Sequence, residues 1–228
     1  MDDVAILIPA YDPDEKLVAL VDDLRPLFRH LVLVDDGSTR GRDVLDAVRG
    51  RVEALLAHDV NRGKGVALRT GLAWIRANLP SVRTVVTADS DGQHRPADIR
   101  RVAEASLGYP DGLVLGVRAF AGKVPFRSQL GNVWTRILFR LLTGLPVRDT
   151  QTGLRGLPRT LFDDLLKRPG DRYEYEIRML VAARRHPAPP LQIPIETVYI
   201  EGNRSSHFRP LKDTFATQGA LLAARLGW

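Results

Sequence analysis

Two aspartates in the stretch VVTADSDGQH, residues 85–94, have the types and spacing to hold a metal ion. Asp89 and Asp91 are separated by one residue, so in an extended chain both side chains project on the same face. Two carboxylates this close repel each other unless a cation lies between them or water solvates both. Mg²⁺ and Mn²⁺ take such oxygen ligands and keep positions open for substrate phosphates, and Gln93 could add a neutral oxygen. Most turns of this pattern bind nothing, and the place of this one after an apolar run raises the odds of a metal site.

Three more polar segments follow apolar runs: PAYD at 9–12, DDGST at 35–39 and DVNRGKG at 59–65. Asp36 could accept hydrogen bonds from the base or ribose of a nucleotide. Equally, DDGST could be a simple turn in which Ser38 or Thr39 caps the next helix. The glycines, Arg62 and Lys64 of NRGKG precede a helical pattern, where backbone amides could cradle an anion. The segment lacks the spacing of a P-loop.

These motifs are positioned by alternating strand and helix patterns. Short apolar runs predict strands at 4–9, 30–35, 51–59, 82–89 and 111–118. Apolar residues at three- and four-residue intervals predict helices across 17–28 and 66–75. Alternation of this kind predicts an α/β fold whose mostly parallel sheet is covered by helices on both faces. Ligands bind outside the carboxyl ends of such strands, so the four polar segments should converge on one cleft.

The second half of the chain is less regular, although nothing in it marks a domain boundary. We expect a one-sided helix at 130–142, a polar turn at 148–156, a helix at 173–185 and a strand at 191–200. A final helix carries an apolar stripe that could pack on the core, the favoured reading, or dock at a membrane interface. At 228 residues, a single domain spanning 1–228 is expected.

Composition narrows the partners and the compartment. The net charge of +6 and the sequence pI near 10.0 indicate a polyanionic partner. With no cysteine, disulfides and thiolate metal sites are excluded. The acidic start with its short apolar run does not resemble a signal peptide, and no apolar run is long enough to predict a membrane span. We therefore expect a cytoplasmic protein.

IPAYD, DDGST, NRGKG and ADSDGQH occur in that order, each after an expected strand. In this the chain resembles the inverting family 2 glycosyltransferases of the GT-A fold. It is most similar to their polyprenyl-phosphate sugar synthases, the group of dolichyl-phosphate mannose synthase, from residue 4 to about 213. The resemblance implies a nucleotide-sugar-binding half at 1–118 and an acceptor-binding half at 119–228.

The same resemblance implies the residues of the donor site. A nucleotide-diphosphate sugar would contact a set made of Pro9, Ala10, Tyr11, Asp36, Lys64 and Asp89. Mg²⁺ or Mn²⁺ would be bound by Asp89, Asp91 and Gln93, with the two aspartates as the catalytic residues. The family's first motif often reads Pro-Ala-Tyr-Asn-Glu, whereas this chain has Asp12 and Pro13 there. A metal ion on the diphosphate would stabilise the charge that develops as the sugar leaves.

More cations follow the fifth expected strand than one diphosphate requires: Arg118, Lys123, Arg127, Arg136 and Arg155. A second phosphate is the natural partner. The resemblance implies that Arg118, Arg127 and Arg155 bind the phosphate of a polyprenyl (dolichyl or undecaprenyl) acceptor. The enzyme would then work peripherally, at the inner face of the cell membrane, either alone or with a separate membrane protein. An ionised phosphate oxygen needs no strong base.

Two alternatives stay open in the sequence. A glycosyltransferase with a soluble or polymeric sugar-hydroxyl acceptor would need a base, for which Asp91 or Glu176 is the candidate. A basic nucleic-acid binder is the second alternative. No zinc-finger or RNP-like pattern supports it, and the acidic strand ends would repel a phosphate backbone. We therefore expect no nucleic-acid partner.

Overall fold

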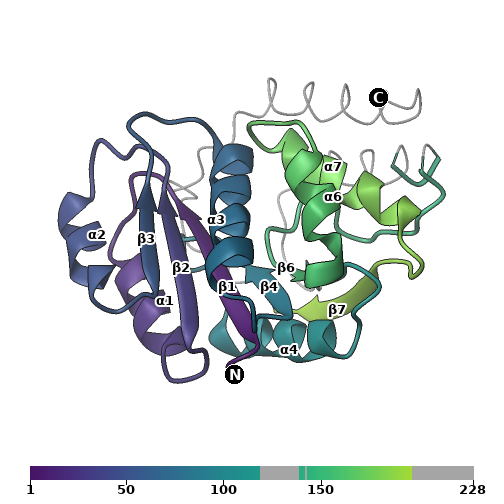
Figure 1. The fold of residues 1–228 in the computed structure, drawn as a ribbon, viewed down its shortest axis with the longest axis horizontal. Helices are drawn as coiled ribbons and strands as arrows, with labels where there is room; N and C mark the ends of the chain where they lie inside the picture. Colours follow the sequence, from purple (N-terminus) through teal and green to yellow (C-terminus); the bar gives the residue numbers. More distant parts are fainter. Residues whose placement is uncertain (119–138, 142, 197–228) are drawn as a thin grey trace.

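The computed structural model describes residues 1–118, 139–141 and 143–196 of the chain. In these residues seven strands form one sheet, in the order β3-β2-β1-β4-β6-β5-β7 (Figure 1). The strands are β1 (Val4–Ala10), β2 (His30–Asp35), β3 (Ala54–Ala57), β4 (Thr84–Thr87), β5 (Val114–Arg118), β6 (Arg155–Pro158) and β7 (Leu191–Ile195). All neighbours pair in parallel except β6, which is antiparallel to both β4 and β5. The predicted mostly parallel α/β sheet is confirmed.

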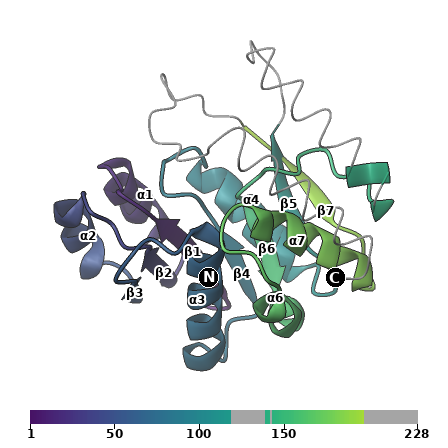
Figure 2. The same cartoon turned by 90° about the horizontal axis from the view of Figure 1, so that it is seen from above.

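Helices cover both faces of the sheet (Figures 1 and 2). One core joins the sheet to α1 (Lys16–Leu24), α2 (Arg42–Arg49) and α4 (Pro96–Leu107). The other joins it to α3 (Lys64–Asn78), α6 (Phe162–Lys167) and α7 (Glu174–Ala182). Short 3₁₀ turns, η1 (Arg159–Leu161) and η2 (Ala183–Arg185), precede α6 and follow α7.

Strand β1 shows why both faces are covered. It is buried along its whole length, and alternate side chains of a strand point to opposite faces. Ala5 and Leu7 therefore join the core beneath α3, while Ile6 and Ile8 join the core beneath α1. Each fully buried leucine or isoleucine contributes roughly 1.5–3 kcal/mol relative to an exposed one. A strand with polar residues on either face would lose one of the two layers.

The strand order of the sheet reverses at β1, and α/β sheets form their ligand crevice at the carboxyl ends of the strands beside such a point. β2 and β3 lie on one side of β1 and β4 lies on the other, and ligands of α/β sheets bind at such a switch point. Pairing of β1 with β2 continues to Ala10, but pairing with β4 ends at Leu7. Pro9, two residues beyond Leu7, has no N–H with which to continue that ladder. The proline thus lets the two strands separate where the polar segments begin.

The antiparallel strand β6 was missed by the sequence analysis, which predicted only a polar turn at 148–156. Its register pairs Arg155 with Thr87 and Pro158 with Thr84. Because β6 runs against β4, the residues that precede it arrive at the carboxyl edge of β4. This orientation brings residues 149–153 to the crevice from the second half of the chain.

The other boundaries differ modestly from the predictions. β3, β4 and β5 are shorter than the apolar runs that predicted them, and β7 begins at the predicted residue. Helix α7 with η2 matches the predicted helix, and the bounds of α1 and α3 shift by a few residues. Most of the predicted helix at 130–142 and the whole final helix lie outside the described residues. Among the helices that the structure does describe, none combines the length and apolarity needed to cross a bilayer.

Two glycines in the left-handed region offer a matched test of how closely the loops at the crevice pack. Gly37 in DDGST has φ +70°, and a Cβ there would lie 2.2 Å from the backbone carbon of Val60. Gly144 has φ +75°, and within the described residues nothing lies within 4 Å of a Cβ placed there. Gly144→Ala should therefore cost only the left-handed strain, about 1 kcal/mol, whereas Gly37→Ala must also move backbone and should cost at least about 2 kcal/mol. Urea unfolding measures both; equal losses would contradict the close packing.

Candidate active site

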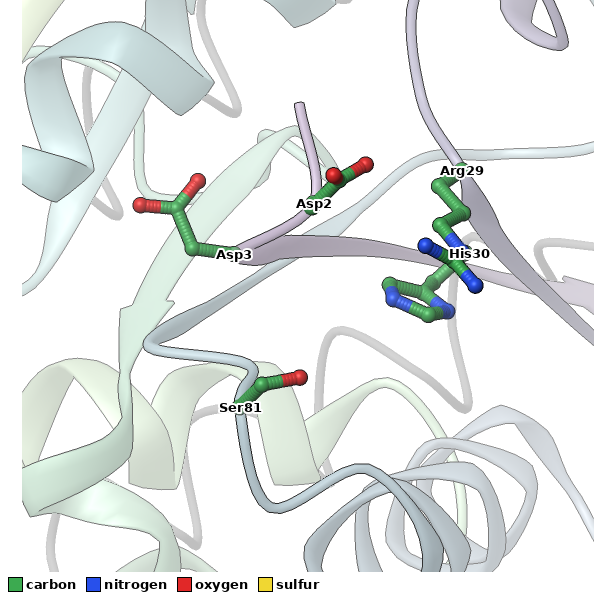
Figure 3. Close-up of a pocket in the computed structure, with 5 residues that line it drawn as sticks. All are labelled: Asp2, Asp3, Arg29, His30 and Ser81. Atoms are coloured by element: carbon green, nitrogen blue, oxygen red, sulfur yellow. The ribbon is translucent and has the colours of Figure 1, made fainter.

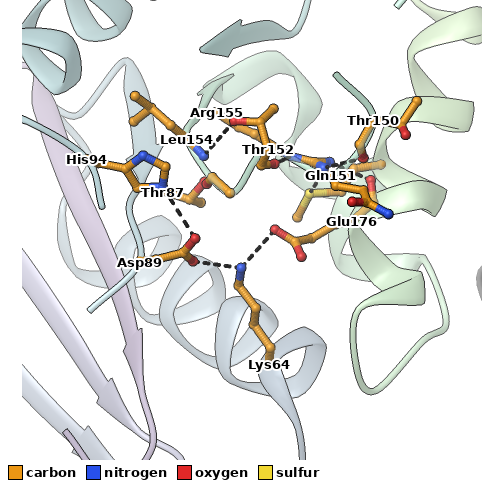
Figure 4. A network of polar contacts seen from close by, with 12 residues as sticks. Lys64, Thr87, Asp89, His94, Thr150, Gln151, Thr152, Leu154, Arg155 and Glu176 are labelled. Atoms are coloured by element: carbon orange, nitrogen blue, oxygen red, sulfur yellow. Dashed lines mark hydrogen bonds and ion pairs between the residues drawn. The ribbon is translucent and has the colours of Figure 1, made fainter. Parts of the chain in front are cut away.

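Asp89 lies at the centre of a partly buried ionic network at the carboxyl edge of the sheet (Figure 4). The Lys64 ammonium, on the first residue of α3, lies 2.7 Å from Asp89 Oδ1. The same nitrogen lies 3.0 Å from Glu176 Oε1 on α7. His94 Nε2 lies 3.3 Å from the other oxygen of Asp89. Residues from three separate segments of the chain thus converge on one carboxylate.

The network keeps Asp89 ionised although its surroundings are largely buried. Burial alone would raise the pKa of Asp89, but the charge of Lys64 and the hydrogen bond from His94 outweigh it and hold the pKa well below the ordinary value. Burial would likewise lower the pKa of Lys64, but the charges of Asp89 and Glu176 raise it. At neutral pH the site therefore contains a carboxylate and an ammonium in contact.

Asp91 lies within electrostatic reach of Asp89. Its pKa is raised, first by burial and next by the charge of Asp89, as expected for two acids near one site. Its Oδ1 accepts a hydrogen bond from the backbone N–H of Gln93 at 3.1 Å. The side chain of Gln93 has no described hydrogen bond that would fix it as a ligand.

The pair of acids fits a hard divalent cation that is completed by substrate. In the residues covered by the structure, no group of three or more acidic or histidine side chains is arranged to hold a metal. Mg²⁺ commonly binds through one or two carboxylates together with substrate phosphates and water, so two protein ligands suffice. The repulsion that raises the pKa of Asp91 is relieved by such a cation.

Gly153 brings the β6 segment against Asp89. Thr87 Oγ1 donates a hydrogen bond to Gly153 O at 2.7 Å, which fixes the segment beside the end of β4. A Cβ at position 153 would lie 2.3 Å from Asp89 Oδ2. No real contact is that short, so any side chain at this position would displace the carboxylate. Gly153 was not predicted as a site residue, because its segment reads as a polar turn in the sequence.

Arg155 requires a correction, since it was predicted to bind the acceptor phosphate. Its side chain is fully buried, with 0% exposure. Its guanidinium donates hydrogen bonds to the backbone carbonyls of Thr152, Thr150 and Glu176. Arg155 therefore ties the β6 segment to α7 from behind the site and is not accessible to a phosphate in the crevice.

Arg118, the second predicted acceptor residue, lies at the end of β5 on the edge that carries Asp89. Its Nε and Nη2 donate to the two oxygens of Asp149 at 2.7 and 3.1 Å. Asp149 is completely buried, whereas the Arg118 side chain is 28% exposed. The carboxylate thus fixes the guanidinium at the rim of the crevice. Arg127, the third predicted acceptor residue, lies outside the described residues.

Asp36 was predicted to accept hydrogen bonds from a nucleotide, but in the structure it binds groups of the chain itself. The alternative, in which Ser38 or Thr39 caps the next helix, is not observed either, because α2 begins after Gly41 without a side-chain cap. The two oxygens of Asp36 accept the backbone N–H groups of Arg62 and Gly63 at 2.9 and 2.7 Å, and His58 Nδ1 lies 2.7 Å from Oδ1. The amides predicted to cradle a ligand anion therefore hold the Asp36 carboxylate. The carbonyl of Asp171 occupies the next amides, those of Gly65 and Val66. From the NRGKG segment, only the Lys64 side chain is described in contact with Asp89.

Asp12 of the PAYD motif connects the loop after β1 to the loop after β2. Asp12 has φ +48°, and its Oδ1 accepts the backbone N–H groups of Thr39 and Arg40 at 2.8 and 2.9 Å. Burial would raise the pKa of Asp12, but these hydrogen bonds outweigh burial and lower the pKa below its ordinary value. Pro9 and Ala10 are buried in β1, and Tyr11 is half-buried at the edge just beyond it. Asp12 thus links the first motif to Thr39 of DDGST and to Arg40 after it.

A separate pocket lies at the opposite edge of the sheet (Figure 3). Its lining residues precede or begin β1, β2 and β4: Asp2, Asp3, Arg29, His30 and Ser81. None of the predicted site residues lines it. The chemistry predicted from the sequence therefore belongs to the carboxyl edge and not to this pocket.

Comparison with known proteins places the chain among sugar transferases. The model of glycosyl transferase family 2 matches residues 5–166, well over half of the chain. A UDP-N-acetylglucosamine–dolichyl-phosphate N-acetylglucosaminyltransferase of Methanococcus voltae is 27% identical, covering 87% of this chain and 86% of its own. A polyprenol monophosphomannose synthase of Mycolicibacterium smegmatis is 26% identical, covering 70% of this chain and 63% of its own.

Solved structures show the same fold. Glucosyl-3-phosphoglycerate synthase from Mycobacterium tuberculosis, in complex with Mn²⁺, UDP-glucose and phosphoglyceric acid, superposes with a TM-score of 0.73 at 21% identity. The match covers 97% of this chain and 79% of that one. The predicted GT-A type fold is confirmed by this likeness.

Replacing Arg155 tests its structural role. Arg155→Lys keeps the positive charge but removes the fork, so buried carbonyls lose their donors and unfolding free energy should fall by at least about 2 kcal/mol. Chemical denaturation of the full chain measures the loss. The control is Arg49→Lys on the exposed face of α2, which should stay within about 0.5 kcal/mol of the parent. Equal stability of the two variants would exclude the structural role.

Neutralising Asp91 should stabilise the metal-free protein. A carboxyl whose pKa is raised on folding destabilises the folded state when the pH is above that raised pKa. The destabilisation vanishes when the pH falls below the pKa of Asp in the unfolded chain, about 3.9. Asp91→Asn, which retains an oxygen for the Gln93 amide, should therefore melt at a higher temperature at pH 7 in the presence of chelator. The gain should shrink as the pH falls and disappear below the unfolded pKa, by about pH 3. A lower melting temperature at pH 7 would contradict the assignment of Asp91 as a repelled acid.

Proposed function

The chain belongs to glycosyl transferase family 2, and from this premise we propose that it transfers a hexose, with inversion, from a nucleotide-diphosphate sugar to a polyprenyl phosphate. The observation that carries the proposal is the ionised Asp89 at the end of β4, beside the switch point of the sheet and within reach of Asp91. A donor bound there would place its diphosphate at these acids.

The donor would lie across the crevice between β1 and β4. Tyr11, just beyond β1, would line the base and ribose side together with the buried backbone of Pro9 and Ala10. Asp36 would act indirectly, because its carboxylate fixes the loop that carries Lys64. The Lys64 ammonium would face the phosphates, where positive charge favours departure of the nucleoside diphosphate.

Asp89 and Asp91 would hold a divalent cation, with Gln93 as a candidate third ligand. When bound, Mg²⁺ or Mn²⁺ would neutralise charge on the departing diphosphate. The Mn²⁺-containing complexes of the M. tuberculosis synthase support this choice of cofactor by analogy of fold. The role of the chain itself is to keep Asp89 ionised and correctly placed, through His94 and the close approach of Gly153.

A phosphate acceptor suits this site because Glu176 is not well placed to act as a general base. Glu176 is buried and ion-paired with Lys64, so it is poorly placed to take a proton from a hydroxyl. An ionised acceptor phosphate brings its own nucleophilic oxygen and needs only cations to position it. Arg118 at the rim would supply one, and Arg127 remains a predicted second. Relatives named for dolichyl-phosphate and polyprenol acceptors support this choice.

The proposed setting is the cytoplasmic face of the cell membrane, where nucleotide sugars and lipid phosphates meet. The net positive charge of +6 favours an anionic membrane surface. Residues 1–118 would bind the donor and residues 119–228 the acceptor, with the C-terminal segment or a separate membrane protein providing the attachment.

The alternative with a hydroxyl acceptor is favoured by one observation. The raised pKa of Asp91 moves that carboxyl toward the range of a general base. In that reaction Asp91 would take the proton of a soluble or polysaccharide sugar instead of sharing a metal.

Labelled donors distinguish the two acceptors. The full chain is incubated with Mn²⁺ and each of several labelled nucleotide sugars, with and without polyprenyl phosphate. We expect label that extracts into organic solvent only when the lipid phosphate and the metal are both present. Label transferred to added sugars and kept in the aqueous phase would favour the alternative. Extractable label from no donor would reject the lipid acceptor.

Asp91→Ala tests the acidic pair within the same assay. Loss of one of two carboxylates that share a cation should lower turnover by about 10²–10³-fold or more, while the fold survives because a repulsion is removed. Asp23→Ala, an exposed acid on α1, is the matched control and should retain full turnover. Full activity of Asp91→Ala in Mn²⁺ would show that the site has been assigned to the wrong residues.

A further inference from the structure

Both oxygens of Asp89 are already engaged by groups of the chain itself. Lys64 lies 2.7 Å from Oδ1, and His94 lies 3.3 Å from Oδ2 (Figure 4). The Lys64 side chain is 19% exposed and the Asp89 side chain 28%, so water screens the contact poorly. The position that a divalent cation would take against Oδ1 is therefore held by an ammonium group.

An ammonium and a divalent cation cannot share that oxygen at close range. A divalent ion and an ammonium bound to the same carboxylate oxygen would lie close enough to repel each other strongly where water screens them poorly. A metal that approaches Asp89 alone must therefore either displace Lys64 or bind beside its charge. Glu176 retains one contact with Lys64, at 3.0 Å, so the lysine need not leave the site altogether.

A nucleoside diphosphate changes this balance. Its phosphate oxygens offer Lys64 a second anionic partner, and the four-carbon stem of a lysine allows the ammonium to swing from one partner to the other. Lys64 is also the first residue of α3, at the rim of the crevice, so its side chain can turn without disturbing the helix. With the diphosphate present, Asp89 becomes available to the metal.

We propose that Lys64 is the resident counter-cation of Asp89 and that it makes divalent-metal binding depend on the nucleoside diphosphate. The inference rests on the proposed function, because it takes the donor to carry a diphosphate. Metal alone binds weakly, since it competes with the lysine. Metal and nucleotide together bind tightly, and by linkage each raises the affinity of the other by the same factor.

Mn²⁺ binding provides a readout that does not need turnover. Free Mn²⁺ is followed by electron paramagnetic resonance during titration of the full chain, alone and with UDP or GDP, and binding of Mn²⁺ to the nucleotide itself is subtracted. We expect the nucleotide to raise the Mn²⁺ affinity of the parent protein at least tenfold. In Lys64→Met, affinity without nucleotide should rise at least tenfold, and the nucleotide should enhance it much less.

Two further variants guard against a trivial result. Lys167→Met removes an exposed lysine from α6 and should leave both affinities unchanged. Glu176→Gln removes the second partner of Lys64, so the ammonium should hold Asp89 more firmly and Mn²⁺ affinity without nucleotide should fall. Lys64→Met and Glu176→Gln are thus expected to act in opposite directions, which general destabilisation would not produce. Circular dichroism checks that each variant is folded.

The outcomes separate this inference from the proposed function. Equal Mn²⁺ affinity of the parent protein with and without nucleotide would overturn the inference and leave the transferase proposal standing. So would a nucleotide-free affinity that Lys64→Met does not raise. Failure of the parent protein to bind Mn²⁺ with either nucleotide would instead count against the metal-dependent function itself, and the inference would fall with it.

Discussion

A carboxylate in a poorly hydrated crevice needs a cation close by, and the Asp89 carboxylate imposes this requirement on the rest of the site. Lys64 meets it from the start of α3, while Glu176 on α7 shares the charge of the lysine. Three segments that are distant in sequence therefore meet in one ionic network. Helices α3 and α7, which carry Lys64 and Glu176, are held there by the same apolar core, so the ionic contacts orient the site and need not stabilise the fold.

The antiparallel strand β6 links the two halves of the chain at that point. A parallel strand in the same position would begin at the far edge of the sheet, and the residues before it would lie away from Asp89. Reversal brings Gly153 against the carboxylate and Asp149 against Arg118. Arg155 then secures this segment to α7 from inside the core. The Arg155 guanidinium, which was predicted to bind the acceptor phosphate, thus supports the site from within the core.

Much of the first half could be predicted from the sequence, because buried parallel strands are written as continuous apolar runs followed by polar turns. Strand β2 matches its predicted bounds, and the edge that gathers Asp89, Asp91 and Asp36 follows from parallel topology alone. β6 could not be recognised, because Arg-Gly-Leu-Pro contains a charge, a glycine and a proline and is buried only by its neighbours. The partners of Arg155 and Asp36 are equally invisible in the sequence. Apart from His58 beside Asp36 and the Met179 sulfur beside Arg155, these partners are backbone groups that almost any residue type could supply.

The lack of a side chain at Gly153 can be used when homologous sequences are compared. A chain can keep both acids of the DSD segment and still hold the first of them in a different position, if the residue that packs against it, at the place of Gly153, carries a side chain. Surveys of homologous sequences that count only the acids would include such chains as competent. Reading position 153 together with position 89 gives a stricter criterion, and it flags the degenerate copies that a motif search would accept.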